Sequence, residues 1–157
     1  MQNARRFNVN EKKLTLYECF DEYQKAEALS GQNTIYCNKC QRHSSAITQD
    51  EIYKAPNVLI IILNRGKGNI FECDLDFPLE LNLSKYVKNN SSPKFYNLIG
   101  VISHLGESSM SGHFIAMCKH FDDGWYLFND AFVVPKSEKE IHKGTPYILF
   151  YQNKYLS

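Results

Sequence analysis

Apolar side chains recur at helical spacing near the start of the chain and at strand spacing over much of the remainder. The helical stretch overlaps "TLYE" (Thr15–Glu18), a capping box whose hydroxyl and carboxylate can each accept a hydrogen bond from an otherwise unpaired amide. Its apolar positions lie three or four residues apart, as on one face of a helix: Leu16, Cys19, Phe20 and Tyr23. We therefore expect an amphipathic helix over residues 16–24.

The later stretches predict strands. "VLIIIL" (Val58–Leu63) is an unbroken apolar run, which is typical of a strand buried on both faces. Segments 95–105, 113–119 and 125–130 predict three successive strands joined by polar connections, and 145–152 predicts a terminal strand. The pattern indicates an α+β fold, with an early helix followed by mainly antiparallel sheet.

Two shorter features complete this pattern. "TIYCNKCQRH" (Thr34–His43) predicts a strand, a tight knuckle and a second strand, and the polar segment 45–53 fits a two-stranded arm exposed to water. "SEKE" (Ser137–Glu140) is a second capping box and predicts a short helix. We expect residues 1–13 to be a disordered lead-in and residues 14–157 to form a single domain.

Composition narrows the class of protein. Of 157 residues, 43% are hydrophobic and 13% aromatic, which is a globular composition. Eighteen Lys and Arg nearly balance seventeen Asp and Glu, so the charge gives no argument for binding nucleic acid. No apolar run approaches the roughly 18–20 residues that span a membrane, so we expect no membrane association. Without a secretory signal at the N-terminus, the five cysteines favour a reduced cytoplasmic or nuclear setting.

The stretch "SGHFIAMCKH" raises the first question of chemistry, because His113 is a candidate general base. Gly112 is expected to leave open space where a substrate backbone can approach, and the small residues over 106–112 suit a gate. Asn129 and Asp130 end the neighbouring predicted strand, so either can orient the imidazole as the third member of a triad. The alternative is that these two residues simply end a strand in an Asx turn.

No nucleophile for this base is evident. Cys118 is five residues beyond His113 on the same predicted strand, and an odd offset places it on the opposite face. Cys19 lies on the apolar face of the helix, and Cys73 lies among carboxylates that raise a thiol pKa. The serines beside the histidine, Ser109 and Ser111, lack the strained elbow of a serine hydrolase.

Cys37 and Cys40 form a C-x2-C pair, which is half of a tetrahedral zinc site. His43 is a possible third ligand, and no fourth ligand is evident. A redox role requires a βαβ setting that this polar arm lacks. A zinc half-site and two reduced thiols on a turn remain open as alternatives.

Taken together, these motifs resemble the C-terminal part of the catalytic domain of ubiquitin-specific proteases, which are papain-like cysteine deubiquitinases. The resemblance covers residues 14–152. "YNLIGVISHLGESSMSGHFIAMCK" resembles the family's histidine box, with His113 at the base position and Phe114 where a Tyr is usual. "WYLFND" resembles the next box, which implies Asn129 as the third triad member and Asp130 as a supporting group or stand-in.

Three further motifs resemble the same family. "YILFYQ" is similar to its closing strand, "APNVLIIILNR" to its central strand and "GQNTIYCNKC" to its second zinc-binding cysteine pair. The resemblance implies that Gly112, Phe114 and His104 border the channel for the C-terminal tail of ubiquitin. For His104, a role in tail binding or in steadying the intermediate and a structural role remain alternatives.

The departures from the family are specific. The nucleophile lies in a cysteine box such as "GNTCYLN", and neither this box nor the first C-x-x-C pair occurs here. Gly66 stands where the family has an aromatic residue. The resemblance therefore implies the palm and part of the fingers of a deubiquitinase, with ubiquitin and ubiquitinated proteins as partners.

We accordingly expect the isolated chain to be inactive, and to need no cofactor for catalysis beyond a possible structural zinc in the whole domain. The alternative is a ubiquitin-binding or scaffold module that keeps the fold without catalysis. A partial domain can expose surface that its missing part would cover, so self-association is a further expectation.

Overall fold

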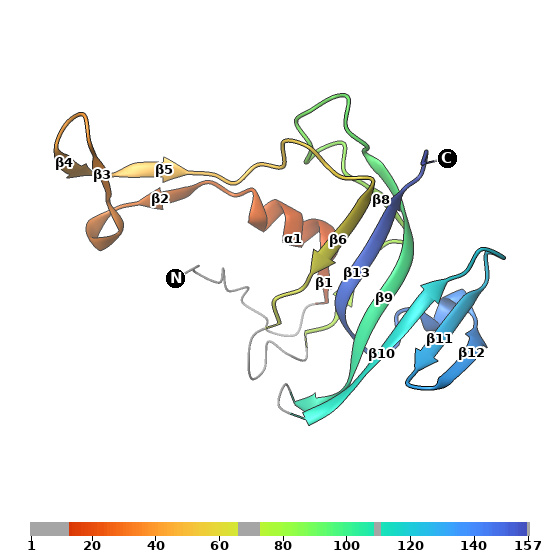
Figure 1. Ribbon diagram of the computed structural model, residues 1–157. Coiled ribbons are helices and arrows are strands. Elements are labelled where there is room, and N and C mark those ends of the chain that lie inside the picture. Colours follow the sequence, from red (N-terminus) through yellow and green to blue (C-terminus); the bar gives the residue numbers. More distant parts are fainter. Residues whose placement is uncertain (1–12, 66–72, 109–110, 157) are drawn as a thin grey trace.

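The computed structural model describes residues 13–65, 73–108 and 111–156 (Figure 1). Residues 1–12 of the predicted lead-in lie outside this part, as do Gly66 and Ser109. In chain order the elements are β1 (Leu14–Thr15), α1 (Leu16–Tyr23), β2 (Glu27–Leu29), η1 (Gly31–Asn33), β3 (Ile35–Cys37), β4 (Arg42–Ser44), β5 (Ala46–Thr48), β6 (Val58–Ile62), β7 (Leu75–Asp76), β8 (Glu80–Asn82), β9 (Phe95–Ser108), β10 (Ser111–Lys119), β11 (Trp125–Asn129), β12 (Phe132–Lys136), η3 (Glu138–Glu140) and β13 (Thr145–Asn153).

Both predicted capping boxes are present. At the start of α1, the Thr15 hydroxyl accepts from the amide of Glu18 at 3.2 Å, and the Glu18 carboxylate accepts from the amide of Thr15 at 2.9 Å. The second box, formed by Ser137 and Glu140, begins the 3-10 turn η3. Each box satisfies amides that helical bonding leaves unpaired, which is why these helices start where they do. Among the described residues, no helix is long and apolar enough to cross a membrane.

A seven-stranded sheet forms the main body of the structure. Its strand order is β12-β11-β10-β9-β13-β6, with β8 also paired to β9, and these neighbours are antiparallel. The pairs β2–β5 and β3–β4 form an arm that extends away from the sheet, as Figure 1 shows. The predicted fold class, the strand–knuckle–strand of the arm and the order of the last strands are therefore confirmed. Strand β12 follows directly after the predicted strands and was not expected.

One face of the sheet carries the core. Successive strands contribute a cross-strand row of apolar residues to this face, because the registers place them opposite one another. Leu16 and Phe20 of α1 belong to the same hydrophobic cluster, so the helix packs against this face. The row consists of Ile61, Leu149, Val101, Met117 and Leu127.

The opposite face is also apolar, but the described residues leave it largely uncovered. The prediction that the strand 58–63 is buried on both faces is therefore wrong. Strand β6 is the edge strand of the sheet, and its alternate side chains point outward, with Ile60 54% and Ile62 72% exposed. The registers join Ile62 to a row that crosses the whole sheet, made of Ile62, Ile148, Ile102, Ala116, Phe128 and Val133.

Candidate active site

His113 and Asn129 are brought together by the pairing of β10 with β11. Nε2 of His113 lies 2.5 Å from Oδ1 of Asn129, which is a hydrogen bond between the two side chains. Asn129 is the last residue of β11, directly before the two-residue turn into β12. Antiparallel pairing thus places the carboxamide beside the imidazole, at the end of the sheet where the predicted gate lies.

Asp130 lies farther from the imidazole of His113 than Asn129 does. Its Oδ2 lies 3.7 Å from Nε2 of His113, and its side chain is 79% exposed. Its φ of 50° is in the left-handed region, which Asp tolerates better than most residues and which the tight turn requires. The structure therefore makes Asn129 the hydrogen-bonding partner of His113 and leaves Asp130 as a nearby exposed charge.

The hydrogen bond determines which ring nitrogen of His113 is available for chemistry. The amide oxygen of Asn129 only accepts hydrogen bonds, so Nε2 of the neutral ring carries the proton and donates it. Nδ1 then keeps its lone pair, and no described group bonds to it. An imidazole held through one nitrogen, with the other nitrogen open, can take a proton from a nucleophile placed next to it.

Gly112 does not leave open space, contrary to the prediction. A Cβ built at this position overlaps the ring of His104 and lies 2.6 Å from the carbonyl oxygen of Leu105. The ring of His104 therefore fills the room that the glycine provides. His104 is itself 5% exposed, so the structure places its ring inside the protein rather than on an open binding surface.

Segment 106–112, which was predicted to form a gate, consists mostly of strand residues. Strand β9 reaches Ser108 and β10 begins at Ser111, with a register shift between Ser111 and His113. Two residues of β9, Gly106 and Glu107, lie opposite the single Gly112, which is a β-bulge. Bulges of this kind often re-aim a side chain beside an active site.

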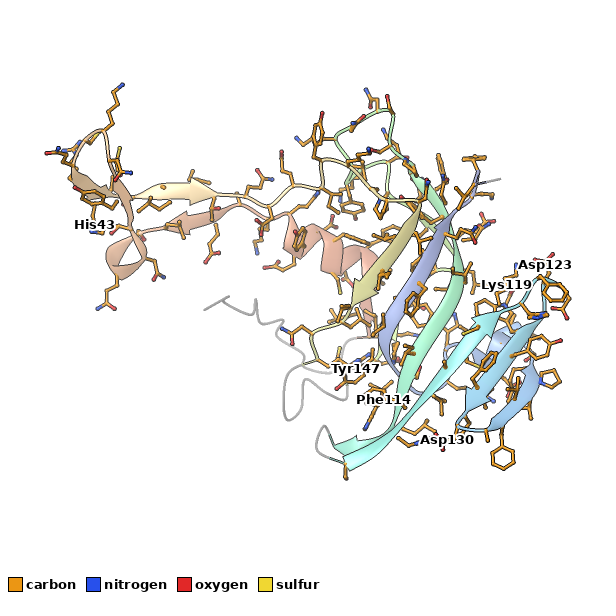
Figure 2. The ribbon with its side chains drawn as sticks, in the orientation of Figure 1. His43, Phe114, Lys119, Asp123, Asp130 and Tyr147 are labelled. Atoms are coloured by element: carbon orange, nitrogen blue, oxygen red, sulfur yellow. The ribbon has the colours of Figure 1, made fainter. Side chains whose placement is uncertain are left out.

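Three aromatic rings pack together on the face of β10 opposite the side chain of His113. Phe114 contacts His104 with ring centroids 4.9 Å apart and Tyr147 with centroids 5.3 Å apart, both edge to face. Figure 2 shows Phe114, Tyr147 and Asp130 at the same end of the sheet. Phe114 is 54% exposed, so it is the predicted tail-binding residue of this group that lies most open. Tyr147 was not predicted, and the sequence signal for it was Pro146, because a proline within a strand often marks a bulge.

None of the five thiols forms a hydrogen bond or an ion pair with His113 within the described chain. Cys118 is five residues along β10, roughly 16 Å away at strand spacing. Burial raises the pKa of the Cys19, Cys73 and Cys118 thiols, so each favours the neutral form. For Cys73 the main cause is burial, with Asp74 a smaller contribution, whereas the sequence argument named only neighbouring carboxylates.

The arm carries Cys37 and Cys40 at its knuckle. A backbone hydrogen bond from Cys40 is the largest contribution to a lowered Cys37 pKa, and this favours the thiolate that metals bind. His43, at the far end of the arm in Figure 2, lies 3.4 Å from Oγ1 of Thr34 through Nδ1. Within the described chain, no three His, Cys, Asp or Glu residues are grouped so as to hold a metal. The zinc half-site stays a prediction.

Comparison with known proteins identifies the fold. The structure of the SAGA Ubp8/Sgf11/Sus1/Sgf73 DUB module bound to ubiquitin aldehyde matches with a TM-score of 0.75 and 32% identity, over 94% of this chain and 35% of that chain. The same kind of module bound to monoubiquitin matches with a TM-score of 0.75 and 34% identity, over 94% and 34%. The mainly antiparallel sheet is therefore that of the papain-like fold of ubiquitin-specific proteases.

The sequence comparisons identify the family. A profile described as ubiquitin carboxyl-terminal hydrolase matches residues 17–151. Ubiquitin carboxyl-terminal hydrolase 8 of Saccharomyces cerevisiae is 34% identical in an alignment 160 residues long. This alignment includes 92% of this chain and 33% of the yeast protein. Ubiquitin carboxyl-terminal hydrolase 15 of Homo sapiens is 34% identical over 147 residues, covering 88% and 15%. The chain belongs to the ubiquitin carboxyl-terminal hydrolase family of deubiquitinating enzymes, and it spans a third or less of the length of these two relatives.

Proposed function

We propose that this chain is the histidine-bearing part of a cysteine-type deubiquitinase, and that a cysteine outside these 157 residues is the nucleophile. The observation that carries the proposal is the hydrogen bond of 2.5 Å between Nε2 of His113 and Oδ1 of Asn129. It fixes the tautomer and the angle of the imidazole and leaves Nδ1 as the basic nitrogen. A thiol is the nucleophile that such a histidine–asparagine pair serves in papain-like enzymes.

In the reaction, Nδ1 of His113 removes the proton of the thiol, and the thiolate attacks the carbonyl carbon of the C-terminal glycine of ubiquitin. The imidazolium then donates this proton to the departing lysine amine, so the isopeptide bond breaks and a thioester remains. Water attacks the thioester carbonyl while His113 accepts one of its protons, the carbon–sulfur bond breaks to release the free C-terminal carboxyl of ubiquitin, and the imidazolium returns the proton to sulfur. Asn129 holds the ring throughout, because the developing imidazolium donates to the same amide oxygen.

Ubiquitin and ubiquitinated proteins are the partners that follow from this proposal. Two structural relatives are DUB modules bound to ubiquitin aldehyde and to monoubiquitin, which supports the same partner here. We place the protein in the cytoplasm or the nucleus, because all five cysteines are free thiols and such compartments keep thiols reduced.

We further propose that Cys37 and Cys40 supply two of the four ligands of a structural zinc. The thiolate-stabilising hydrogen bonds at Cys37 support this, since zinc binds the deprotonated sulfur. The metal would stiffen the tip of the arm and take no part in catalysis. Metal analysis of the purified chain should find less than one zinc per monomer. One zinc per monomer that is lost on Cys37→Ser would show that other ligands complete the site.

Hydrolysis of a fluorogenic ubiquitin C-terminal amide tests the catalytic proposal. The 157-residue chain alone should give no turnover, whereas a longer form of the protein with a cysteine box should be active. In that form, His113→Ala should lower kcat by roughly 10²-fold or more, because the thiol loses its general base. Turnover by the chain alone that His113→Ala abolishes would show that the nucleophile lies within these residues.

A scaffold that binds ubiquitin without cleaving it is the second candidate. It is favoured by one observation, that no thiol of this chain bonds to His113 among the described residues. A longer form that binds ubiquitin but has no cysteine box, and no turnover, would establish this candidate in place of the first.

A further inference from the structure

Arg65 is a buried cation just after β6, and its side chain joins separate segments of the chain. The residue is only 6% exposed. Its Nε donates to the carbonyl oxygen of Pro146 at 2.5 Å, and its Nη1 donates to the carbonyl oxygen of Cys73 at 2.6 Å. Burial lowers the pKa of the guanidinium and costs free energy, so a residue that serves only as a surface charge would not be placed here.

The carbonyl of Pro146 begins a bulge in β13. Pro146 and Ile148 pair with adjacent residues of β9, so Tyr147 is an extra residue on its strand. With regular alternation Tyr147 would share the core face of Leu149, two residues later. The bulge turns it instead toward the opposite face, where its ring meets the rings of Phe114 and His104.

Two residues at the end of β6 hold the bulge from one side. The amide of Leu63 donates to the carbonyl oxygen of Tyr147 at 2.9 Å, next to the bond from Arg65 to Pro146. Leu63 contributes an ordinary backbone bond, which any residue can make. Arg65 contributes a charged, planar donor that reaches a second segment at the same time, which other side chains cannot reproduce.

Packing contacts link Tyr147 to the strand that carries His113. The Tyr147 ring lies edge to face with Phe114 at an interplanar angle of 89°, and it is also close to His104 at 6.0 Å between centroids. Phe114 directly follows His113 in β10. Phe114 is held between these two rings on one face of β10, and His113 lies on the other face, so the link between them runs through the backbone of the strand.

We propose that Arg65 is a positioning residue for the catalytic histidine. Its hydrogen bond to Pro146 fixes the bulge at Tyr147, which keeps the Tyr147 ring packed against Phe114 and so holds His113 at hydrogen-bond distance from Asn129. The inference rests on the proposed role of His113 as the base. Arg65 touches neither substrate nor the reacting atoms, so its effect is on the geometry of the imidazole. A displacement of about 1 Å in such a group is enough to lower a rate by up to about 100-fold.

The first test compares Arg65→Lys with Arg42→Lys, an exposed arginine on the arm that serves as the matched control. Lysine keeps the charge but lacks the planar fork that reaches both carbonyls. ¹H–¹⁵N NMR of the neutral His113 ring in the 157-residue chain should show loss of the downfield shift of the hydrogen-bonded Nε2 proton in Arg65→Lys only. In an active longer form of the protein, the same change should lower kcat roughly tenfold.

A second pair of variants tests the same link without touching the buried charge. Tyr147→Phe keeps the ring and should retain the downfield Nε2 proton shift of the parent protein, whereas Tyr147→Ala should reproduce the effect of Arg65→Lys. If Arg65→Lys does not fold, the comparison of Tyr147→Phe with Tyr147→Ala alone tests the inference. An unchanged Nε2 proton shift of His113 in folded Arg65→Lys or in Tyr147→Ala would overturn the inference. Loss of activity on His113→Ala tests the proposed function separately.

Discussion

Replacing Gly112 with alanine is a direct test of how the strands pack beside His113. A Cβ at this position overlaps the ring of His104 and lies 2.6 Å from the carbonyl oxygen of Leu105. The histidine ring is buried and its neighbours leave it little room to retreat. The carbonyl belongs to the backbone of the paired strand, which moves only if the bulge opens. The substitution must therefore displace β10 from β9 locally.

Overpacking of this kind costs typically 1–3 kcal/mol, and we expect about 2 kcal/mol for Gly112→Ala. Gly100→Ala is the matched control, because Gly100 lies on the paired strand β9 and a Cβ there meets Phe150 at 3.5 Å, an ordinary contact. We expect the control to leave the free energy of unfolding unchanged or to raise it by up to about 1 kcal/mol, because its backbone conformation suits alanine.

Urea denaturation of the two variants, followed by circular dichroism, measures both free energies of unfolding. Combining Gly112→Ala with His104→Ala should cost less than the sum of the two single changes, because removal of the ring frees part of the space. The contact with the Leu105 carbonyl persists, so recovery should be partial. Equal stabilities for Gly112→Ala and Gly100→Ala would refute the packing described here.

Three further predictions concern other parts of the fold. Thr15→Ala removes the capping box of α1 and should lower the free energy of unfolding by about 1 kcal/mol in urea denaturation. The hydrogen bond from the Ser137 amide lowers the pKa of Glu140 in the folded state. The carboxylate therefore stabilises the fold above its unfolded pKa of about 4.3, and this contribution is lost as the pH falls through the lower folded pKa. Glu140→Gln should accordingly flatten the acid side of a plot of the free energy of unfolding against pH. Ile62→Thr should reduce binding of the dye ANS to the apolar face more than the same change at Ile47, which is 78% exposed but lies on the arm.

Local sequence signals were sufficient for much of the fold. The capping box at Thr15 depends only on residues within one turn, and so it could be placed from the chain alone. The order of the last strands follows from short turns, and it brought Asn129 beside His113 as expected. Features that rest on neighbours in sequence were therefore predictable.

Features that depend on residues far apart in the sequence could not be predicted. The apolar run at β6 indicated a strand, but not that it would lie at the edge of the sheet with Ile62 facing outward. The small residue Gly112 indicated space, but not that the ring of His104, on the neighbouring strand β9, would fill it. Tyr147 joins the site only because a bulge shifts its register against β9, and the partner that holds the bulge, Arg65, is far away in sequence.

The protonation state of the His113 ring is the most direct test of the central claim, that Asn129 prepares this histidine as a general base. Long-range ¹H–¹⁵N NMR distinguishes a protonated ring nitrogen from one with a free lone pair. In the neutral form, the 157-residue chain should show the proton on Nε2 with the downfield shift of a hydrogen-bonded proton, and Asn129→Ala should remove this shift. A dominant Nδ1–H form in the unmodified chain, or an Nε2 proton shift unaffected by Asn129→Ala, would contradict the account.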